Sequence, residues 1–308
     1  MKTIFYDPSV TFTSSAVATI GFFDGVHRGH CHLLSRVAEE ARAVGMESMV
    51  VTFDRHPRQV LQPDWRPELL STLDEKLRRL SETAVDVCVV LPFSKALSML
   101  SAQQFMADVL QNRLHVKRLV MGYDSRFGHN RAEGFADYVR YGQALGMAVE
   151  QAEALVVEGQ AVSSSRIRAC LRAGDVSEAA QLLGRDYVLQ GRVVNGFHEG
   201  HRLGFPTANL DAAQLEQLVP ANGVYAVRAS VGENGPVMLG MTNIGTRPTF
   251  HGQGVSVETH LFDFEKDIYG ERLSIAFAQR IRSEQKFESE AALAEQLRKD
   301  KEFIINYL

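Results

Sequence analysis

The sequence has few cysteines, no excess of basic residues and no apolar run long enough to cross a membrane. Its three cysteines, Cys31, Cys88 and Cys170, lie far apart in 308 residues. This excludes a disulfide framework and a Cys-x-x-Cys zinc site, and it favours a reducing compartment. There are 20 basic and 21 acidic residues up to Gly184, and 13 basic and 16 acidic residues after it. Neither part therefore carries the positive surplus expected of a nucleic-acid-binding protein.

We identify neither a transmembrane segment nor a signal peptide in the sequence. The longest apolar stretch, residues 85–93, is far too short to span a bilayer. Asp7 and Pro8 interrupt any apolar stretch near the start, so we expect no signal peptide and predict a cytoplasmic protein. The length suggests about two domains, and the 45% apolar content allows each to bury a core.

Short apolar runs alternate with segments of helical periodicity in the first 180 residues. We expect helices at 30–44, 74–81, 102–114 and 135–145, and strands at 17–22, 49–53, 85–91, 118–122 and 149–153. Alternating strands and helices imply a parallel sheet covered on both faces. Ligands of such sheets bind beyond the carboxyl ends of the strands, so the segments that follow strands are the first places to search.

The pattern changes after two expected helices at 164–173 and 176–183, which end at Gly184. From there short strands lie between glycines, at 187–194, 223–230, 237–244, 255–264 and 273–281. This is typical of an all-β barrel or sandwich. A C-terminal helix capped by Ser289 closes the chain. We therefore place one domain at residues 1–184 and a second at 185–308.

The first candidate site is the segment 21–30, Gly-Phe-Phe-Asp-Gly-Val-His-Arg-Gly-His, between the first strand and the first helix. Backbone N–H groups at a helix start attract phosphate. His27 and His30 flank Gly29, and two imidazoles there can donate to phosphoryl oxygens as charge develops. The alternatives are a plain glycine turn with two surface histidines, or a zinc site with His32, which no Cys or carboxylate completes.

The second candidate is the segment 162–168, Val-Ser-Ser-Ser-Arg-Ile-Arg. A serine cluster entering a helix offers hydroxyls and free N–H groups, and Arg168 adds a guanidinium that suits phosphate. Alone, the segment also fits an ordinary helix cap.

The third candidate is the segment 204–210, Gly-Phe-Pro-Thr-Ala-Asn-Leu. Thr207 and Asn209 alternate on an extended chain, so both side chains point to one face. A hydroxyl and an amide carbonyl are hard oxygen donors suited to Mg²⁺ already held by phosphates. The alternative is a β-turn after Pro206.

Two further motifs follow, Asn-Ile-Gly-Thr-Arg-Pro-Thr-Phe at 243–250 and Val-Glu-Thr-His-Leu-Phe-Asp-Phe at 257–264. The second alternates polar and apolar residues, so Val257, Thr259 and Leu261 should share one strand face while Glu258 lies on the other. As a lone feature, Glu258 is typical of a solvated strand residue.

The first two motifs together resemble the nucleotidylyltransferase superfamily. With a Gly-x-Asp-x-x-Phe-Gly segment at 122–128, seen here as Gly-Tyr-Asp-Ser-Arg-Phe-Gly, and with the three later motifs, nearly the whole chain resembles the bifunctional bacterial riboflavin kinase/FMN adenylyltransferases. Phe22 stands where that family usually has Asn, which affects one polar contact. Ser125 stands where it usually has Phe, which alters an apolar wall of the first site.

The resemblance implies a Rossmann-type adenylyltransferase domain followed by a mainly antiparallel β-barrel kinase domain with a C-terminal helix. Riboflavin and ATP would give FMN, and FMN and ATP would give FAD and pyrophosphate, with Mg²⁺ as cofactor. It assigns catalysis to His27, His30 and Glu258, metal binding to Thr207 and Asn209, and ligand binding to Gly21, Asp24, Gly25, Gly29, Asp124, Ser164, Ser165, Arg168, Gly191, Gly204, Pro206 and Asn243.

The adenylyl step needs no base, because its nucleophile is already an anionic phosphate. It needs groups that reduce the electrostatic repulsion between this phosphate and ATP. The kinase step uses a neutral ribityl alcohol, whose proton a carboxylate such as Glu258 can accept. The glycine-rich segment 191–204 would wrap the nucleotide, although Phe197-His198 excludes a Walker motif, and 198–201 is one residue short of His-Glu-x-x-His.

Two other functions stay open on sequence grounds. One is a nucleotidylyltransferase of another specificity, which would lack the second β domain. The other is a flavin-binding protein without turnover, which would leave bound flavin unchanged when ATP and Mg²⁺ are added. The partners expected are small molecules, with neither nucleic acid nor membrane, and the sequence leaves the oligomeric state open.

Overall fold

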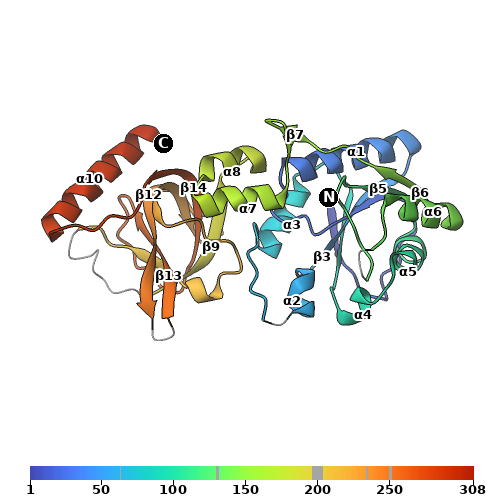
Figure 1. The fold of residues 1–308 in the computed structure, drawn as a ribbon, viewed down its shortest axis with the longest axis horizontal. Helices are drawn as coiled ribbons and strands as arrows, with labels where there is room; N and C mark the ends of the chain where they lie inside the picture. Colours follow the sequence, from blue (N-terminus) through green and yellow to red (C-terminus); the bar gives the residue numbers. More distant parts are fainter. Residues whose placement is uncertain (63, 130–131, 196–203, 234, 250–251) are drawn as a thin grey trace. The chain divides into compact units, whose positions relative to one another are not determined.

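The structure is a computed structural model that describes residues 1–62, 64–129, 132–195, 204–233, 235–249 and 252–308 (Figure 1). The chain forms two compact units. Unit 1 comprises Met1–Pro67 and Leu73–Ser163, and unit 2 comprises Glu68–Thr72 and Ser164–Leu308. Helices α7 (Ser164–Ala173) and α8 (Val176–Leu183) lie in unit 2. The boundary between the two functional domains after Gly184 stays a prediction.

Unit 1 contains a parallel sheet of six strands in the order β1-β4-β3-β2-β5-β6, which confirms the predicted fold class. β1 was not expected from the sequence, because it is a short edge strand with mostly exposed side chains. The strands are β1 (Lys2–Phe5), β2 (Ala16–Ile20), β3 (Glu47–Phe53), β4 (Val87–Leu91), β5 (Val116–Met121) and β6 (Ala148–Gln151).

Both faces of this sheet are covered. Leu34 and Val37 of α1 (Arg28–Val44) and Leu80 of α3 (Leu73–Ser81) share one apolar core with residues of β2, β3, β4 and β5. Tyr138 of α6 (Phe135–Leu145) belongs to a second core, which contains the alternate residues of the same strands. Smaller elements complete the unit: α2 (Pro57–Leu61), α4 (Lys95–Ser98), β7 (Val156–Val157) and β8 (Gln160–Ala161).

The segment 102–114, expected to be one α-helix, differs from that prediction. Only Ala102–Gln104 is α-helical (α5), and Phe105–Gln111 forms a π-helix, η1. The wider turns place Phe105, Met106, Val109 and Leu110 together in the second core of unit 1. Packing of these four side chains therefore compensates for the rarer hydrogen-bond pattern of the π-helix.

The order of the strands reverses direction between β2 and β5. From β2 the chain continues to β3 and β4 on one side, and β5 and β6 lie on the other. Ligands of open parallel sheets bind beyond the carboxyl ends of the strands at such a switch point. The two segments that follow β2 and β5 are 21–30 and 122–128, which are two of the motifs singled out in the sequence.

Unit 2 is a closed antiparallel barrel with the strand order β10-β13-β12-β11-β14-β9, so the alternative of a sandwich is excluded. Tyr187, Tyr225 and Phe277 fill part of its interior. A short 3₁₀-helix, η2 (Ala212–Gln214), follows β10. The strands are β9 (Tyr187–Val194), β10 (Ala208–Leu210), β11 (Gly223–Val231), β12 (Met238–Thr249), β13 (Gly252–Leu261) and β14 (Arg272–Arg282).

The C-terminal helix α10 (Glu290–Tyr307) packs on the outside of this barrel (Figure 1). Ser289 is its N-cap, as predicted, and accepts a hydrogen bond from the N–H of Ala292. Arg282 at the end of β14 holds Asp300 of the helix through a nearly buried ion pair of 2.8 Å. None of the helices in the described part of the chain is long and apolar enough to span a membrane.

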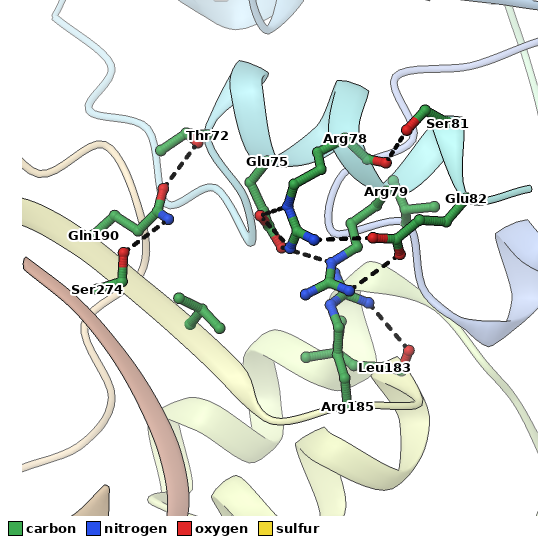
Figure 2. Close-up of polar contacts among 12 residues, drawn as sticks. Thr72, Glu75, Arg78, Arg79, Ser81, Glu82, Leu183, Arg185, Gln190 and Ser274 are labelled. Atoms are coloured by element: carbon green, nitrogen blue, oxygen red, sulfur yellow. Dashed lines mark hydrogen bonds and ion pairs between the residues drawn. The ribbon is translucent and has the colours of Figure 1, made fainter. Parts of the chain in front are cut away.

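A five-residue segment from the first half of the chain, Glu68–Thr72, belongs to unit 2. The N–H of Leu69 donates to the carbonyl of Glu216, and Thr72 contacts the side chain of Gln190 on β9. Figure 2 shows that Gln190 also donates to Ser274 of β14. The chain therefore crosses between the units more than once, which the sequence did not indicate.

Candidate active sites

The turn that follows β2 places His27 at the start of α1. Phe23, Gly25 and Val26 have φ angles of 54°, 74° and 39°, all in the left-handed region. Two of these residues are not glycine, so the backbone of the turn is strained by about 1–3 kcal/mol at each of them. Backbone strain of this kind clusters at functional sites, and it needs surrounding contacts that hold the turn in place.

His27 is buried and caps α1 with its ring. Its Nδ1 accepts a hydrogen bond of 3.2 Å from the N–H of His30. A neutral imidazole with an accepting Nδ1 carries its proton on Nε2. In that tautomer the Nε2–H of His27 is a hydrogen-bond donor, which is the kind of group that a phosphoryl oxygen requires.

His30 lies directly against His27. Their rings are stacked with centroids 3.6 Å apart, and the edge of Phe23 closes the other side. Nδ1 of His30 is enclosed and has no hydrogen-bond partner in the described part of the chain. Burial, followed by the proximity of His27 and Lys76, both of which can carry a positive charge, lowers the pKa of His30 well below 6.5. Its ring is therefore neutral at pH 7.

Gly29 is needed for the close packing of this turn. A Cβ atom there would lie 3.0 Å from the carbonyl oxygen of Val162 and 3.1 Å from Nδ1 of His27. The turn begins at Gly21. A Cβ atom on Gly21 would lie 3.1 Å from the nearest ring carbon of Phe23. Both glycines therefore allow aromatic side chains to approach the backbone.

The predicted binding residues in the two strand-end segments differ in exposure. Asp24 is buried within the first turn, whereas Asp124, after β5, is exposed. The hydroxyl of Ser125 lies 2.8 Å from where a Cβ of Gly122 would be. Tyr138 fixes the end of the second segment, because its hydroxyl both accepts from the N–H of Phe127 and donates to its carbonyl.

The predicted phosphate-binding residues Ser164, Ser165 and Arg168 lie in the first turns of α7, in unit 2. Nε of Arg168 donates to the backbone carbonyl of Glu68 over 2.8 Å, so this side chain is oriented by the segment 68–72. Their role toward the ligand of His27 and His30 stays a prediction.

In unit 2, the strand pairing brings three predicted residues into one row. Glu258 of β13 is directly opposite Asn209 of β10 on one side and Asn243 of β12 on the other. Directly opposed residues of antiparallel strands point to the same face, with Cβ atoms about 4.5–5.5 Å apart. The alternate residues Val257 and Thr259 share the other face, as predicted, and are buried in the barrel, so the row lies on the outer face.

The loop before β10 is held next to this row by His260. Nδ1 of His260 lies 2.8 Å from the carbonyl oxygen of Pro206, and its ring packs between Phe205 and Phe262. Burial lowers the pKa of His260, so a neutral ring with its proton on Nδ1 fits this contact. Strand β13 ends at Leu261, earlier than the predicted residue 264, and Asp263 turns the chain with a φ of 54°.

The glycines expected to bind nucleotide have different surroundings. Gly191 lies in β9 under Leu215 and Leu210, so a Cβ atom there would be 3.0 Å from Leu215. Gly204 has a φ of 81° and open space around it. The part of the glycine-rich segment at 196–203 lies outside the described residues.

Two residues next to these sites were not singled out in the sequence. Lys76 in α3 is almost fully buried close to His30. In the sequence it shares the apolar face of the helix with Leu73, Leu77 and Leu80, and this position could have identified it as a buried cation. Glu284 accepts from the amide of Asn243 at 3.4 Å, and a side chain on Gly245 would collide with its carboxylate.

The residues expected to bind Mg²⁺ fit that ion by their donor chemistry. The amide nitrogen of Asn209 faces the carbonyl of Thr207 at 3.5 Å, which turns the amide oxygen away from that carbonyl. A threonine hydroxyl and an amide oxygen beside a carboxylate are the oxygen ligands that Mg²⁺ prefers. No group of three or more His, Cys, Asp or Glu residues in the described ranges could hold a metal by itself.

Two family models match the chain, one to each half. Residues 10–166 match the model for FAD synthetase, and residues 183–308 match the model for riboflavin kinase. The first range includes His27, His30, Ser164 and Ser165, and the second includes the row of Asn209, Glu258 and Asn243.

Curated relatives cover most of the chain. The bifunctional riboflavin kinase/FMN adenylyltransferase of Escherichia coli K12 is 38% identical over 92% of this chain and 90% of its own length. The protein of the same name from Bacillus subtilis is 36% identical, with 96% and 93% covered. A crystal structure described as a macrolide-efflux protein from Streptococcus pneumoniae is 32% identical, has a TM-score of 0.87 and covers 99% of both chains.

Proposed function

The chain belongs to the bifunctional riboflavin kinase/FMN adenylyltransferase family, and from that premise we propose which of its residues carry each of the two reactions. It phosphorylates riboflavin with ATP to give FMN, and it transfers an adenylyl group from ATP to FMN to give FAD. No observation in this chain favours efflux, the function in the description of the pneumococcal structure.

For adenylyl transfer, His27 and His30 are the catalytic residues. The attacking group is the phosphate of FMN, which is an anion and needs no base. What it needs is relief of its repulsion from the phosphates of ATP, and fixed hydrogen-bond donors supply this. The Nε2–H of His27 and the adjacent ring of His30 sit at the switch point of a parallel sheet, where the helix N-terminus adds further N–H groups.

The serines after Val162 belong to the same proposal. The carbonyl of Val162 packs against Gly29, and Ser164 and Ser165 follow it by two and three residues. A helix that begins with serines offers hydroxyls and backbone N–H groups, which suit phosphate. We assign Ser164, Ser165 and Arg168 to the phosphates, and Gly21, Asp24, Gly25, Gly29 and Asp124 to binding of the two substrates.

For the kinase step, Glu258 is the general base. The attacking group is the neutral hydroxyl of the ribityl chain, and a carboxylate that accepts its proton makes it a nucleophile. Asn209 and Asn243 lie opposite Glu258 on the two neighbouring strands, so the three side chains share one face of the barrel. Gly191, Gly204 and Pro206 are assigned to the nucleotide of this site.

Mg²⁺ completes the kinase site in this proposal, held by Thr207 and Asn209. The ion would neutralise charge on the ATP phosphates. His260 fixes the carbonyl of Pro206 and so sets the backbone from which Thr207 projects. A cytoplasmic location is also part of the proposal, and the few, scattered cysteines support it.

The observation that carries the assignment is the position of Glu258 directly between Asn209 and Asn243. The experiment is chromatography of flavins after the protein is incubated with riboflavin, ATP and MgCl₂, and again with EDTA in place of MgCl₂. FMN and FAD should both form, and both should disappear with EDTA. Riboflavin that stays unchanged in the presence of MgCl₂ would contradict the proposal.

A further inference from the structure

Lys76 is a cation buried inside unit 1. Its side chain belongs to a residue that is only 2% exposed, and its Nζ lies over the ring of Phe22, 4.2 Å from the centroid. The ammonium donates to the carbonyl oxygens of Phe53 at 2.8 Å and Phe22 at 3.2 Å, and lies 3.3 Å from the hydroxyl of Thr52. All three possible donors of the ammonium are thereby used on uncharged acceptors.

These acceptors share one place in the fold, the carboxyl ends of β2 and β3. Phe22 is the last residue before the strained part of the turn, which runs from Phe23 to Val26 and leads to His27. Its carbonyl accepts a second hydrogen bond from the hydroxyl of Thr52, at 3.1 Å. Thr52 on β3 and Lys76 on α3 therefore both fix the position of Phe22, from which the turn begins.

The other cations of α3 behave differently. Arg78 and Arg79 pair with Glu75 and Glu82 at 2.7–3.2 Å, as Figure 2 shows. Lys76, one residue after Glu75, forms no ion pair in the described part of the chain. A buried charge without an ion pair is costly, and an apolar residue of similar length would fill the same space at lower cost. The positive charge of Lys76 must therefore serve a purpose other than stability.

The charge lies beside the turn to which the proposed function assigns two anionic substrates. Asp24 of the turn, Asp54 after β3 and Cys88 of β4 are the titratable groups that face Lys76, while His27 and Lys76 face His30. Burial outweighs these groups and lowers the pKa of Lys76 to about 8, so the ammonium is charged at pH 7. A charge in this position disfavours protonation of His30 and attracts phosphate.

We propose that Lys76 is a positioning residue for FMN adenylylation, which holds the turn of His27 through the carbonyl of Phe22 and places a fixed positive charge beside His30. The proposal rests on the assignment of His27 and His30 to FMN adenylylation. Lys76 acts through the backbone and through His30; it does not touch the reacting atoms.

The test is Lys76→Met in the full chain, with FAD formation measured from supplied FMN and ATP and, separately, FMN formation measured from riboflavin. Displacement of the turn should lower kcat for FAD formation roughly 10–100-fold. FMN formation should stay within about twofold of wild type, which shows that unit 2 is unaffected, and circular dichroism should show that unit 1 keeps its secondary structure. The pKa of His30, followed by NMR of its ring protons, should rise because the nearby charge is gone.

Thr52→Val is the matched control. It removes the hydroxyl that shares the carbonyl of Phe22 but keeps the charge, so the pKa of His30 should not move and the loss of FAD formation should be smaller. If Lys76→Met forms FAD within about threefold of wild type and the pKa of His30 is unchanged, the proposal is wrong. If wild type makes no FAD from FMN, the assigned function fails instead.

A measurement on the wild-type protein needs no variant. The ammonium loses its proton above about pH 8, and with it the charge and one hydrogen-bond donor. FAD formation should therefore fall as the pH rises from 7 to 9.5, by up to about tenfold per pH unit above 8. An FAD-forming rate that stays constant to pH 9.5, while NMR shows Lys76 deprotonated, would overturn the proposal.

Discussion

Glu258 stands directly opposite Asn209 across the pairing of β13 with β10, on the outer face of the barrel. Because β12 places Asn243 on its other side, the strand register puts an asparagine on each side of Glu258. A neutral amide can orient a carboxylate without removing its ability to take up a proton. The arrangement suits a general base.

Glu258→Gln should therefore lower the kinase turnover by roughly 10²–10⁴-fold, because the amide keeps the shape of the side chain but cannot accept the proton. Riboflavin binding, measured by quenching of flavin fluorescence, should stay close to wild type. Adenylylation of supplied FMN should be unaffected, since Glu258 is not among the residues assigned to that step. A kinase turnover within about threefold of wild type would remove Glu258 from the mechanism.

The lowered pKa of His30 predicts that the stability of the protein depends on pH. Its pKa is well below 6.5 in the folded protein and is 6.5 in the unfolded chain. Between those two values the unfolded chain binds the extra proton, so the free energy of unfolding should decrease as the pH falls below about 6.5. Urea unfolding at pH 7.5 and at pH 5.5 measures this difference.

His30→Ala removes the group, so the loss of stability between pH 7.5 and 5.5 should become smaller. His32→Ala, an exposed neighbour on the same helix, is the control and should keep the wild-type dependence. An unchanged dependence in His30→Ala would show that His30 is not held neutral by its surroundings.

The ion pair between β14 and α10 predicts a large effect on stability. Asp300 accepts from Arg282 at 2.8 and 2.9 Å and from Gln296 at 2.8 Å, and both charged side chains are nearly buried. Asp300→Ala leaves the guanidinium buried without its partner and should cost about 3–5 kcal/mol of unfolding free energy. Glu295→Ala breaks an exposed pair with Lys299 and should cause no measurable change. Equal urea midpoints for the two variants would contradict this.

The division of the chain into two units predicts where it can be cut. In unit 2, α8 packs on β9 and β14 and buries Leu182 and Leu183. A fragment of residues 164–308 should phosphorylate riboflavin but make no FAD, and a fragment of residues 185–308 should melt at a lower temperature because that apolar surface is uncovered. If the longer fragment is folded by circular dichroism yet inactive, the kinase site requires residues outside 164–308, such as the segment Glu68–Thr72 or residues of unit 1.

The sequence predicted those elements whose signal is local. The helices at 135–145, 164–173 and 176–183 match their predicted bounds, because periodicity and a following glycine define them. The alternation of Val257, Glu258 and Thr259 predicted the faces of β13 correctly, since the period of a strand is two. The closed barrel could not be separated from a sandwich, because closure depends on the pairing of β9 with both β10 and β14.

Features that depend on contacts distant in sequence were missed. The π-helix at Phe105–Gln111 lies in a segment whose helical pattern is ordinary, and only its packing selects the wider turns. The segment Glu68–Thr72 joins unit 2 through its contact with Glu216, which lies about 150 residues later. Asn209, Glu258 and Asn243 were each singled out, but their place in one row follows from strand register, which the sequence does not state.

We propose that two different sets of residues carry the two reactions. The most direct test mixes two variants, each defective in one step. His30→Ala should form FMN from riboflavin but form FAD roughly 10²–10³-fold more slowly, while Glu258→Gln should form FAD from supplied FMN but not from riboflavin. Incubated together with riboflavin, ATP and MgCl₂, the pair should produce FAD, because FMN released by one variant is the substrate of the other. A mixture that forms no FAD, although each variant retains its own single activity, would contradict the account.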